Sequence, residues 1–333
     1  MEDRASRLVV VGASAGGVEA LKTFVAGLPP DLPAAVGIVL HLSPDSRSRL
    51  PEILSRAGRL PTAFALDGEP VRAGHIYIAV PDSHLVARQG RWAVVRGPRE
   101  NRARPAIDPL FRSAALEYGR STIAVVLSGS RGDGVAGAAA VSTRGGMVIV
   151  QNPEEAEFGG MPASTIAGDH PDRIMPLAAI APAVVEALEE LPEEKPMSDN
   201  VEEEMSLETR YSTLDRETIE RARPPGDPSA FSCPACGGVL WEVDDGEPLR
   251  FRCRVGHAYT ADSVYEDQTA AVEHALWAAF RALHERAELT HRIAHRTRGS
   301  GSTSKRFADL SREALDQANL IRTVLLERND DGD

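Results

Sequence analysis

The sequence predicts an α/β protein whose main domain is a doubly wound, mainly parallel sheet, a Rossmann-like arrangement of three layers. Two observations predict this fold class. Short apolar runs rich in β-branched residues alternate with segments of helical apolar spacing between residues 8 and 190. Apolar content of 42% and charged content of 26% are ordinary globular values, so the chain can build a packed core.

The elements follow in order along this region. Residues 8–12 form an apolar run that ends in a Gly-rich turn, and residues 18–25 continue at helical spacing. Further strands are expected at residues 35–42, 75–80, 85–95, 122–127 and 148–151, with the 85–95 segment folding back on itself at a Gln-Gly turn. Further helices are expected at residues 43–54, 109–118, 134–143, 163–167 and 182–191.

Four parts are expected along the chain. Residues 1–190 form the α/β domain, and residues 191–230 form an acidic, mostly disordered linker because their composition buries little apolar surface. Within this linker, a transient helix is expected at residues 207–221. Between residues 186 and 208 there are ten acidic side chains against one lysine. Residues 231–262 form a small zinc-ribbon-like module, and residues 263–329 form an α-helical hairpin with two apolar faces.

Composition and segment lengths exclude several classes of protein. The first apolar run is too short for a signal peptide and no segment is long enough to span a bilayer, so we expect a cytoplasmic protein without membrane insertion. Three cysteines, an odd number, suit a reducing compartment. A net charge of −12 without a basic stripe argues against nucleic acid as a partner.

The turn at residues 12–16 matches the G-x-S-x-G pattern between a strand and a helix. Small neighbours allow a sharp bend that exposes the Ser14 hydroxyl, as a nucleophile requires. The alternative is a Gly-rich turn that holds a phosphate, with Ser14 as a helix cap. The motif alone leaves both interpretations open.

His41 and Asp133 supply the groups that a serine nucleophile needs. His41 ends the second apolar strand, and Asp133 follows the strand at residues 122–127. Each alone has a plain explanation, His41 as a core residue and Asp133 as a helix cap. Because three complementary groups follow three parallel strands, the topology would bring them together, which favours a catalytic site.

Six segments in consistent order resemble the catalytic domain of the chemotaxis methylesterase family, CheB. They are residues 9–20, His41, and residues 74–79, 101–111, 127–137 and 158–162. The resemblance implies that Ser14, His41 and Asp133 form a catalytic triad that needs no cofactor. It implies a glutamyl methyl ester on a receptor's cytoplasmic helix as substrate, and the family often deamidates glutamine as well.

The resemblance also suggests residues around the substrate. We expect the turn at Ser130 to supply backbone oxyanion donors, and Arg102, Arg104 and Met161 to lie in the cleft. Surface solvation is an equal alternative for the two arginines. The expected partner is a methyl-accepting receptor or another methylated protein. Since the first strand begins by residue 8, we expect no receiver domain ahead of it, and control by a separate receiver or regulatory protein.

Two departures from the family pattern keep a second function open. Ala15 stands where the family often has a hydroxyl residue, and Ser130 and Arg131 stand where members commonly have Met and Gly. The alternative is a regulatory binding protein that retains the fold without turnover. A nucleotide or phosphate binder using the turn at residues 12–17 is a third hypothesis.

The cysteines form a separate motif with one histidine. Cys233, Cys236, Cys253 and His257 have the spacing C-x2-C-x16-C-x3-H. Zinc suits such a set because two short turns can supply a tetrahedral shell, and four protein ligands leave no open position for catalysis. The alternative is three unrelated reduced cysteines. We expect a structural zinc, and a module that docks a partner protein.

Overall fold

The computed structural model describes residues 4–43, 48–130, 132–169, 171–190, 202–213, 226–243, 249–297 and 301–330. The chain divides into two compact units, residues 1–263 and residues 264–333.

A seven-stranded sheet forms the centre of the first unit, and every neighbouring pair of its strands is parallel. The strands lie in the order β3-β4-β2-β1-β7-β8-β9, so β1 is central, with β2, β4 and the edge strand β3 on one side and β7, β8 and β9 on the other. The predicted doubly wound parallel sheet is confirmed. The strands are β1 Leu8–Ala13, β2 Ala35–Leu40, β3 Thr62–Phe64, β4 Ile76–Ile78, β7 Thr122–Val126, β8 Met147–Gln151 and β9 Arg173–Met175.

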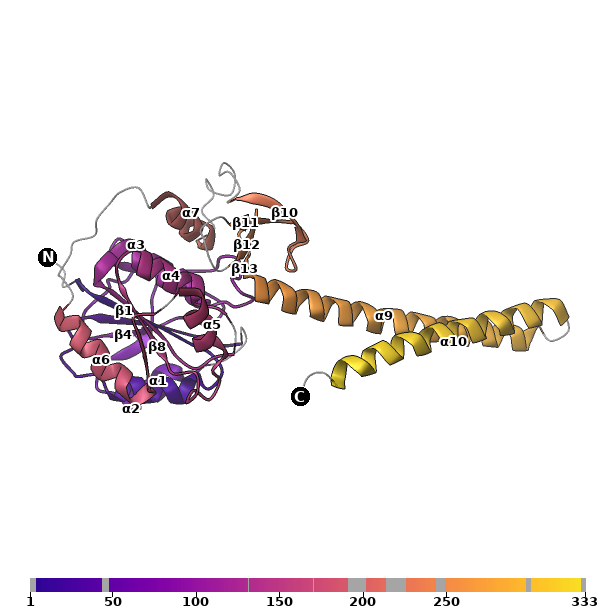
Figure 1. Cartoon of the computed structure of the whole chain (residues 1–333), viewed down its shortest axis with the longest axis horizontal. Helices are drawn as coiled ribbons and strands as arrows, with labels where there is room; N and C mark the ends of the chain where they lie inside the picture. The colour runs from indigo at the N-terminus through magenta and orange to yellow at the C-terminus, as the bar shows by residue number, and fades with distance from the viewer. Residues whose placement is uncertain are drawn as a thin grey trace. The chain divides into compact units, whose positions relative to one another are not determined.

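Helices cover both faces of the sheet (Figure 1). Phe24, Leu54 and Val184, from α1, α2 and α6, belong to one apolar layer. Phe111 and Val141, from α3 and α4, belong to the opposite layer together with residues of α5. The helices are α1 Gly17–Ala26, α2 Leu50–Ala57, α3 Ile107–Tyr118, α4 Val135–Thr143, α5 Gly160–Asp169 and α6 Leu177–Glu190.

Burial on both faces explains why the strands appear in the sequence as continuous apolar runs. Along β2, Val36 and Ile38 face one apolar layer, whereas Ala35 and Val39 face the other. The two edge strands, β3 and β9, have three residues each and were missed by the sequence analysis. Strands this short carry too few apolar residues for a periodicity to appear.

Two local predictions can be compared directly with the structure. The antiparallel hairpin of β5 His84–Arg88 and β6 Arg91–Val95 turns at Gln89 and Gly90, as predicted. Both turn residues have positive φ. The helix expected at residues 43–54 is found as α2, further along the chain, and residues 44–47 lie outside the described residues.

Within the predicted acidic linker at residues 191–230 the structure has a helix, α7 Glu202–Ser212, which overlaps the transient helix expected at residues 207–221 and begins before it. This helix contacts α3, and its Glu208 and Tyr211 are buried. Burial and charge pairing therefore stabilise residues whose composition alone predicts disorder. Residues 191–201 and 214–225 lie outside the described residues.

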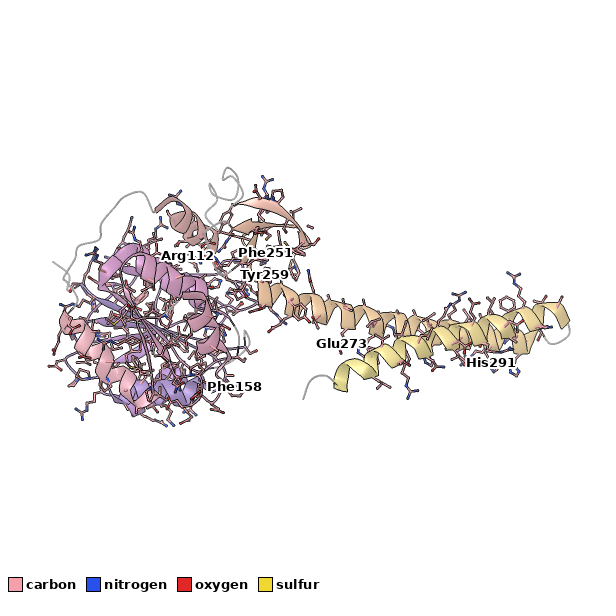
Figure 2. The ribbon with its side chains drawn as sticks, viewed as in Figure 1. Arg112, Phe158, Phe251, Tyr259, Glu273 and His291 are labelled. Atoms are coloured by element: carbon pink, nitrogen blue, oxygen red, sulfur yellow. The ribbon has the colours of Figure 1, made fainter. Side chains whose placement is uncertain are left out.

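A four-stranded antiparallel sheet, called the ribbon below, also belongs to the first unit. Its strands are β10 Asp227–Ser232, β11 Val239–Val243, β12 Arg250–Cys253 and β13 Ala258–Thr260. The edge-to-face pair of Phe231 and Phe251 lies between β10 and β12. Figure 2 labels Phe251 and Tyr259 in this sheet and Arg112 on α3.

Two long helices, α9 Ala261–Arg296 and α10 Gly301–Asp330, provide the second unit with a helical hairpin. Small buried residues line the seam between them, and the Ser311 hydroxyl donates to the Ala287 carbonyl at 2.9 Å. The seam includes Ala287, Ala294, Ala314, Ala318 and Leu325. In the described part of the chain, no helix has the length and apolar character needed to cross a membrane.

Candidate active site and metal cluster

Three polar side chains follow three adjacent strands of the parallel sheet. Ser14 follows β1, His41 follows β2, and Asp133 lies in the loop between β7 and α4. Because β2, β1 and β7 are parallel neighbours, their carboxyl ends meet at one edge. The strand order reverses at β1, which is where open α/β sheets form their sites.

The side chains of Ser14, His41 and Asp133 form a hydrogen-bonded relay. His41 Nδ1 lies 3.1 Å from Ser14 Oγ, and His41 Nε2 lies 2.7 Å from Asp133 Oδ2. With the proton on Nε2, His41 donates to the carboxylate and can accept the serine proton at Nδ1. The histidine is 17% exposed and the aspartate 1%. The structure thus places together the three residues that the sequence analysis selected.

The turn at Ser14 is shaped by its glycines. Gly16 has φ +70°, and a Cβ on Gly17 would lie 2.7 Å from the Leu40 side chain. The first residue before α1 is Gly16, and no side chain caps the helix. The structure therefore does not use Ser14 as a helix cap, and its half-buried hydroxyl is left to face His41.

Asp133 is held by four hydrogen bonds. Besides His41, its carboxylate accepts from the backbone N–H of Ile107 at 2.6 Å and of Asp108 at 3.3 Å, and from Asn101 Nδ2 at 3.1 Å. Burial would raise the pKa of Asp133, but these donors outweigh it and hold the pKa below its usual range. Asp133 is therefore the anion that a triad requires.

Asp108 is a second buried carboxyl beside the relay. Its Oδ1 accepts from the backbone N–H of Gly134 at 3.1 Å and of Gly137 at 2.7 Å, and its Oδ2 accepts from Asn101 Nδ2 at 2.8 Å. Burial and the nearby Asp133 charge raise the pKa of Asp108 to about 7. Neither Asn101 nor Asp108 is predicted as a site residue from the sequence, although both lie in a segment that carries the family resemblance.

A cavity of about 360 Å³ opens at the relay. One side is formed by residues 97–106, called the cavity loop below. Two backbone positions in this loop, Asn101 and Arg102, have φ of +47° and +67°. Asparagine tolerates this conformation better than arginine, so neighbouring contacts must hold the loop in place. The lining residues are Ser14, His41, Leu42, Arg99, Asn101, Arg102, Ala103, Arg104, Pro105 and Ser130.

His84 fixes the cavity loop from beneath. This fully buried side chain donates from Nε2 to the Pro98 carbonyl at 2.7 Å and accepts from the Ala106 N–H at Nδ1 at 3.2 Å. Both contacts require the neutral imidazole. Burial lowers the pKa of His84, which keeps it in that form.

The residues predicted to lie in the substrate cleft have different positions. Arg102, Arg104 and Ser130 line the cavity. Arg104 is also paired with Asp82, through Nη2 to Oδ1 at 2.6 Å. Met161 is fully buried and absent from the lining, which corrects that expectation, because its side chain packs against the backbone of Gly129 beneath the turn. Arg131 lies outside the described residues.

The three cysteines and His257 form a compact cluster in the ribbon. Their ligand atoms all lie within 4.8 Å of one another. Cys236 Sγ is 3.8 Å from Cys253 Sγ, and His257 Nδ1 is 3.5 Å from Cys253 Sγ. A tetrahedral zinc shell would place sulfur atoms about 3.8 Å apart and a sulfur–nitrogen pair about 3.5 Å apart. The donor set and its spacing therefore fit a tetrahedral metal ion.

Comparison with known proteins agrees with this geometry. The family model described as CheB methylesterase matches residues 9–184, slightly more than half of the chain and a range that contains Ser14, His41 and Asp133. The chain belongs to the CheB methylesterase family. The ribbon, its metal-ligand cluster and the helical hairpin lie beyond the residues that the CheB model matches.

Individual CheB proteins show the same extent of similarity. The protein-glutamate methylesterase/protein-glutamine glutaminase 2 of Anaeromyxobacter dehalogenans is 36% identical over 185 residues, which are 55% of this chain and 54% of that protein. The protein of Yersinia pestis with the corresponding name is 39% identical over 165 residues, 48% of this chain and 47% of that protein. The chain spans about half the length of the curated relatives it matches.

A solved CheB structure confirms the fold of the first domain. The crystal structure of the Thermotoga maritima CheB methylesterase catalytic domain has a TM-score of 0.52 and is 35% identical in sequence. The match covers 97% of that chain and 54% of this one.

Proposed function

We propose that this chain is a serine hydrolase that demethylates glutamyl methyl esters on a partner protein. The observation that supports this most is the Ser14–His41–Asp133 relay at the mouth of a cavity of about 360 Å³. The CheB family model covers residues 9–184, which contain the relay, and relatives named protein-glutamate methylesterase are 36% and 39% identical to about half of this chain. A binding protein without turnover would not need a serine within 3.1 Å of an oriented histidine.

The proposed reaction has two steps. In the first, His41 takes the Ser14 proton as the hydroxyl oxygen attacks the ester carbonyl, and the proton then leaves on methanol. The acyl group is now joined to Ser14. In the second, His41 takes a proton from water as the water oxygen attacks the acyl carbonyl, the bond to Ser14 Oγ breaks, the proton passes to Ser14 Oγ, and glutamate is released. Asp133 holds the imidazole and stabilises its cation throughout.

Backbone donors beside the nucleophile would stabilise the oxyanion. We assign this role to the turn at Ser130, which lines the cavity together with Ser14. Such a donor contributes roughly 3 to 4 kcal/mol of transition-state stabilisation in comparable hydrolases. The same relay and oxyanion donors would release ammonia instead of methanol from a glutamine side chain. A glutamine side chain, which has the same length and a similar planar carbonyl group, is therefore a second candidate substrate.

The charge of the cavity supports an acidic protein segment as substrate. Arg99, Arg102 and Arg104 line it, while Asp82 pairs with Arg104. A methyl-accepting receptor or another methylated protein, whose ester lies among free carboxylates, has the complementary charge. A separate receiver or regulatory protein is the control partner that we expect for the enzyme.

For the cluster of Cys233, Cys236, Cys253 and His257 we propose a structural zinc ion. All four positions of the tetrahedron are supplied by the protein, so the ion would have no place for a substrate. Its contribution is to the folding of the ribbon, because a sheet this small has little core of its own.

Methanol release from methylated receptor cytoplasmic fragments tests the proposal. The wild-type chain is expected to release methanol, and Ser14→Ala is expected to release none, with an unchanged fold. Ser142→Ala, on α4 and outside the cavity lining, is a matched control that should keep full activity. A folded wild-type chain that releases no methanol from several receptor fragments would favour the binding-protein alternative.

A further inference from the structure

The ribbon and α7 are joined to the α/β domain of residues 1–190, called the catalytic domain below, by a buried group of charges, called the charge cluster below. It comprises Glu100 and Arg112 from the catalytic domain, Glu208 from α7, and Arg250 and Arg252 from β12. Arg252 is fully buried and Glu100 is 1% exposed. Charges this deep are stable only when paired, so the cluster fixes the three parts against one another.

Arg252 links the ribbon to both of the other parts. Its Nη2 lies 3.3 Å from Glu100 Oε2 and 3.1 Å from Glu208 Oε1, and its Nη1 donates to the Gly256 carbonyl at 2.9 Å. Arg112 reaches the same Glu100 carboxylate at 3.0 Å. Opposite charges flanking Glu100 lower its pKa to about 2 although burial opposes this, so it is ionised at neutral pH.

The ribbon also pairs with the cavity loop through the backbone. Asn101 N–H donates to the Ala258 carbonyl at 2.8 Å, and Ala258 N–H donates to the Arg99 carbonyl at 3.4 Å. The first strand residue after the metal ligand His257 thus lies along the loop that lines the cavity. Strand β13 therefore supplies the cavity loop with backbone hydrogen bonds that the parallel sheet does not provide.

The side chain of Asn101 completes the connection to the relay. Its Oδ1 accepts from the Thr260 N–H of β13 at 3.0 Å. Its Nδ2 donates to Asp108 Oδ2 at 2.8 Å and to Asp133 Oδ1 at 3.1 Å. Because only the amide oxygen can accept and only the amide nitrogen can donate, these partners fix the orientation of the side chain.

We propose that Asn101 is a positioning residue for Asp133, and that the metal-bound ribbon holds Asn101 in place from the other side. The proposal rests on the hydrolase function above. Its consequence is that the relay is competent only while the ribbon is folded and docked. The connection is short, since one amide bridges the backbone of β13 and the carboxylate that orients His41.

The metal ligands lie next to the docking contacts in the sequence. Cys253 follows Arg252, which pairs with Glu100, and His257 precedes Ala258, which pairs with the cavity loop. The backbone between them is closed by Cys253 N–H to the His257 carbonyl at 2.9 Å. Loss of the metal would release this turn and with it both contacts.

Substitution of Asn101 tests the positioning role. Asn101→Asp keeps the size and the tolerance for positive φ but removes both N–H donors, and Asn101→Gly removes the side chain at a φ that glycine accepts. Both variants should lower kcat at least roughly tenfold, as expected for a displaced catalytic group, and change KM less than about twofold. Asn319→Asp, at an exposed position of α10, is the matched control and should leave both constants unchanged.

Undocking the ribbon without touching the cavity tests the second half of the proposal. Glu208→Gln removes the α7 charge that pairs with Arg250 and Arg252, and Glu285→Gln is its exposed control. The readout is hydrogen exchange of the Asn101 and Thr260 amides, measured with kcat in the intact chain. Glu208→Gln and Cys236→Ser should both speed exchange at these two amides and lower kcat, and Glu285→Gln should do neither.

Metal exchange gives a reversible version of the same measurement. A chelator should speed exchange of these amides, and added Zn²⁺ alone should restore protection and activity together. Unchanged exchange in the chelated protein or in Cys236→Ser, or unchanged kcat in both Asn101 variants, would overturn the proposal.

Hydrogen exchange and Ser14 labelling together distinguish failure of the positioning role from failure of the proposed hydrolase function. If the wild-type chain releases no methanol, the rate at which a fluorophosphonate labels Ser14 replaces kcat as the activity readout. Faster amide exchange without any Ser14 reactivity in the wild type would mean that the proposed function fails. Normal Ser14 reactivity in both Asn101 variants would mean that the positioning role fails.

Discussion

Asp108 and Asp133 share one hydrogen-bond donor, since the Asn101 amide lies 2.8 Å from one carboxyl and 3.1 Å from the other. Two buried carboxyls this close cannot both ionise freely, and the donors are divided unequally between them. His41 and the first N–H groups of α3 bond to Asp133, so its pKa falls, whereas the pKa of Asp108 rises to about 7. The pair therefore keeps its charge on the residue that orients His41.

The raised pKa of Asp108 predicts a specific pH dependence of stability. In the folded protein Asp108 keeps its proton up to about pH 7, whereas in the unfolded chain the same carboxyl loses it above the ordinary pKa of 3.8. The stabilising contribution of Asp108 is therefore complete below about pH 4 and is lost as pH rises through about 7. The wild type should lose free energy of unfolding relative to Asp108→Asn over this interval, at no more than about 1.4 kcal/mol per pH unit. Chemical denaturation at several pH values measures the difference, and a difference that stays constant would contradict the prediction.

Removing the charge of Asp133 should abolish most of the activity while leaving the fold. In Asp133→Asn the amide cannot accept from every donor that now contacts the carboxylate, and His41 would lose its correct tautomer. We expect kcat to fall roughly 10³- to 10⁴-fold with a small effect on KM. Steady-state methanol release measures both constants. Retention of more than a tenth of the activity would mean that Asp133 does not serve as the orienting carboxylate.

The charge cluster predicts acid lability of the docked ribbon. The pKa of Glu100 is lowered to about 2, so its contribution to stability is present above its unfolded pKa of 4.5 and is lost as pH falls toward 2. Glu100→Gln removes one of the two carboxylates that Arg112 and Arg252 share and should cost about 3 to 5 kcal/mol at pH 7. The variant should also show a weaker dependence on pH between 4.5 and 2 than the wild type. Tryptophan fluorescence during urea unfolding follows both effects, and identical pH profiles would refute the assignment.

The cluster of cysteines predicts one zinc ion per chain. Cys236 is the most exposed of the three cysteines, so Cys236→Ser should remove a ligand with little packing cost. We expect the variant to lose the ion and its ribbon to unfold at lower denaturant concentration than the catalytic domain. Elemental analysis of dialysed protein gives the stoichiometry. A metal-free wild type with a folded ribbon would contradict the prediction.

The seam of the helical hairpin predicts a contrast between two neighbouring positions on α10. Ala318 is fully buried and Asn319 is exposed. Ala318→Leu should force the helices apart and destabilise the hairpin by about 1 to 3 kcal/mol, whereas Asn319→Leu should have little effect. Hydrogen exchange of α9 and α10 amides in the whole chain distinguishes them. Equal protection in both variants would mean that Ala318 is not part of the seam.

The sequence by itself determined the features that depend on local pattern. Buried parallel strands appear as apolar runs because both of their faces are covered, and residues just past their carboxyl ends are brought to one edge by the topology. Ser14, His41 and Asp133 could be selected on that basis. The spacing of Cys233 to His257 likewise predicts two ligand turns within one small module.

Only the tertiary structure decided how the ribbon is connected to the relay through Asn101. Glu100 and Arg252 are 152 residues apart, and Asn101 and Thr260 are 159 apart, so no local period relates them. For the same reason the sequence predicts only a transient helix at residues 207–221, because the stability of α7 comes from burying Glu208 among arginines of other segments. Such contacts form only when separate surfaces dock. Their interaction free energy depends on both partners, so it cannot be read from the sequence of either segment alone.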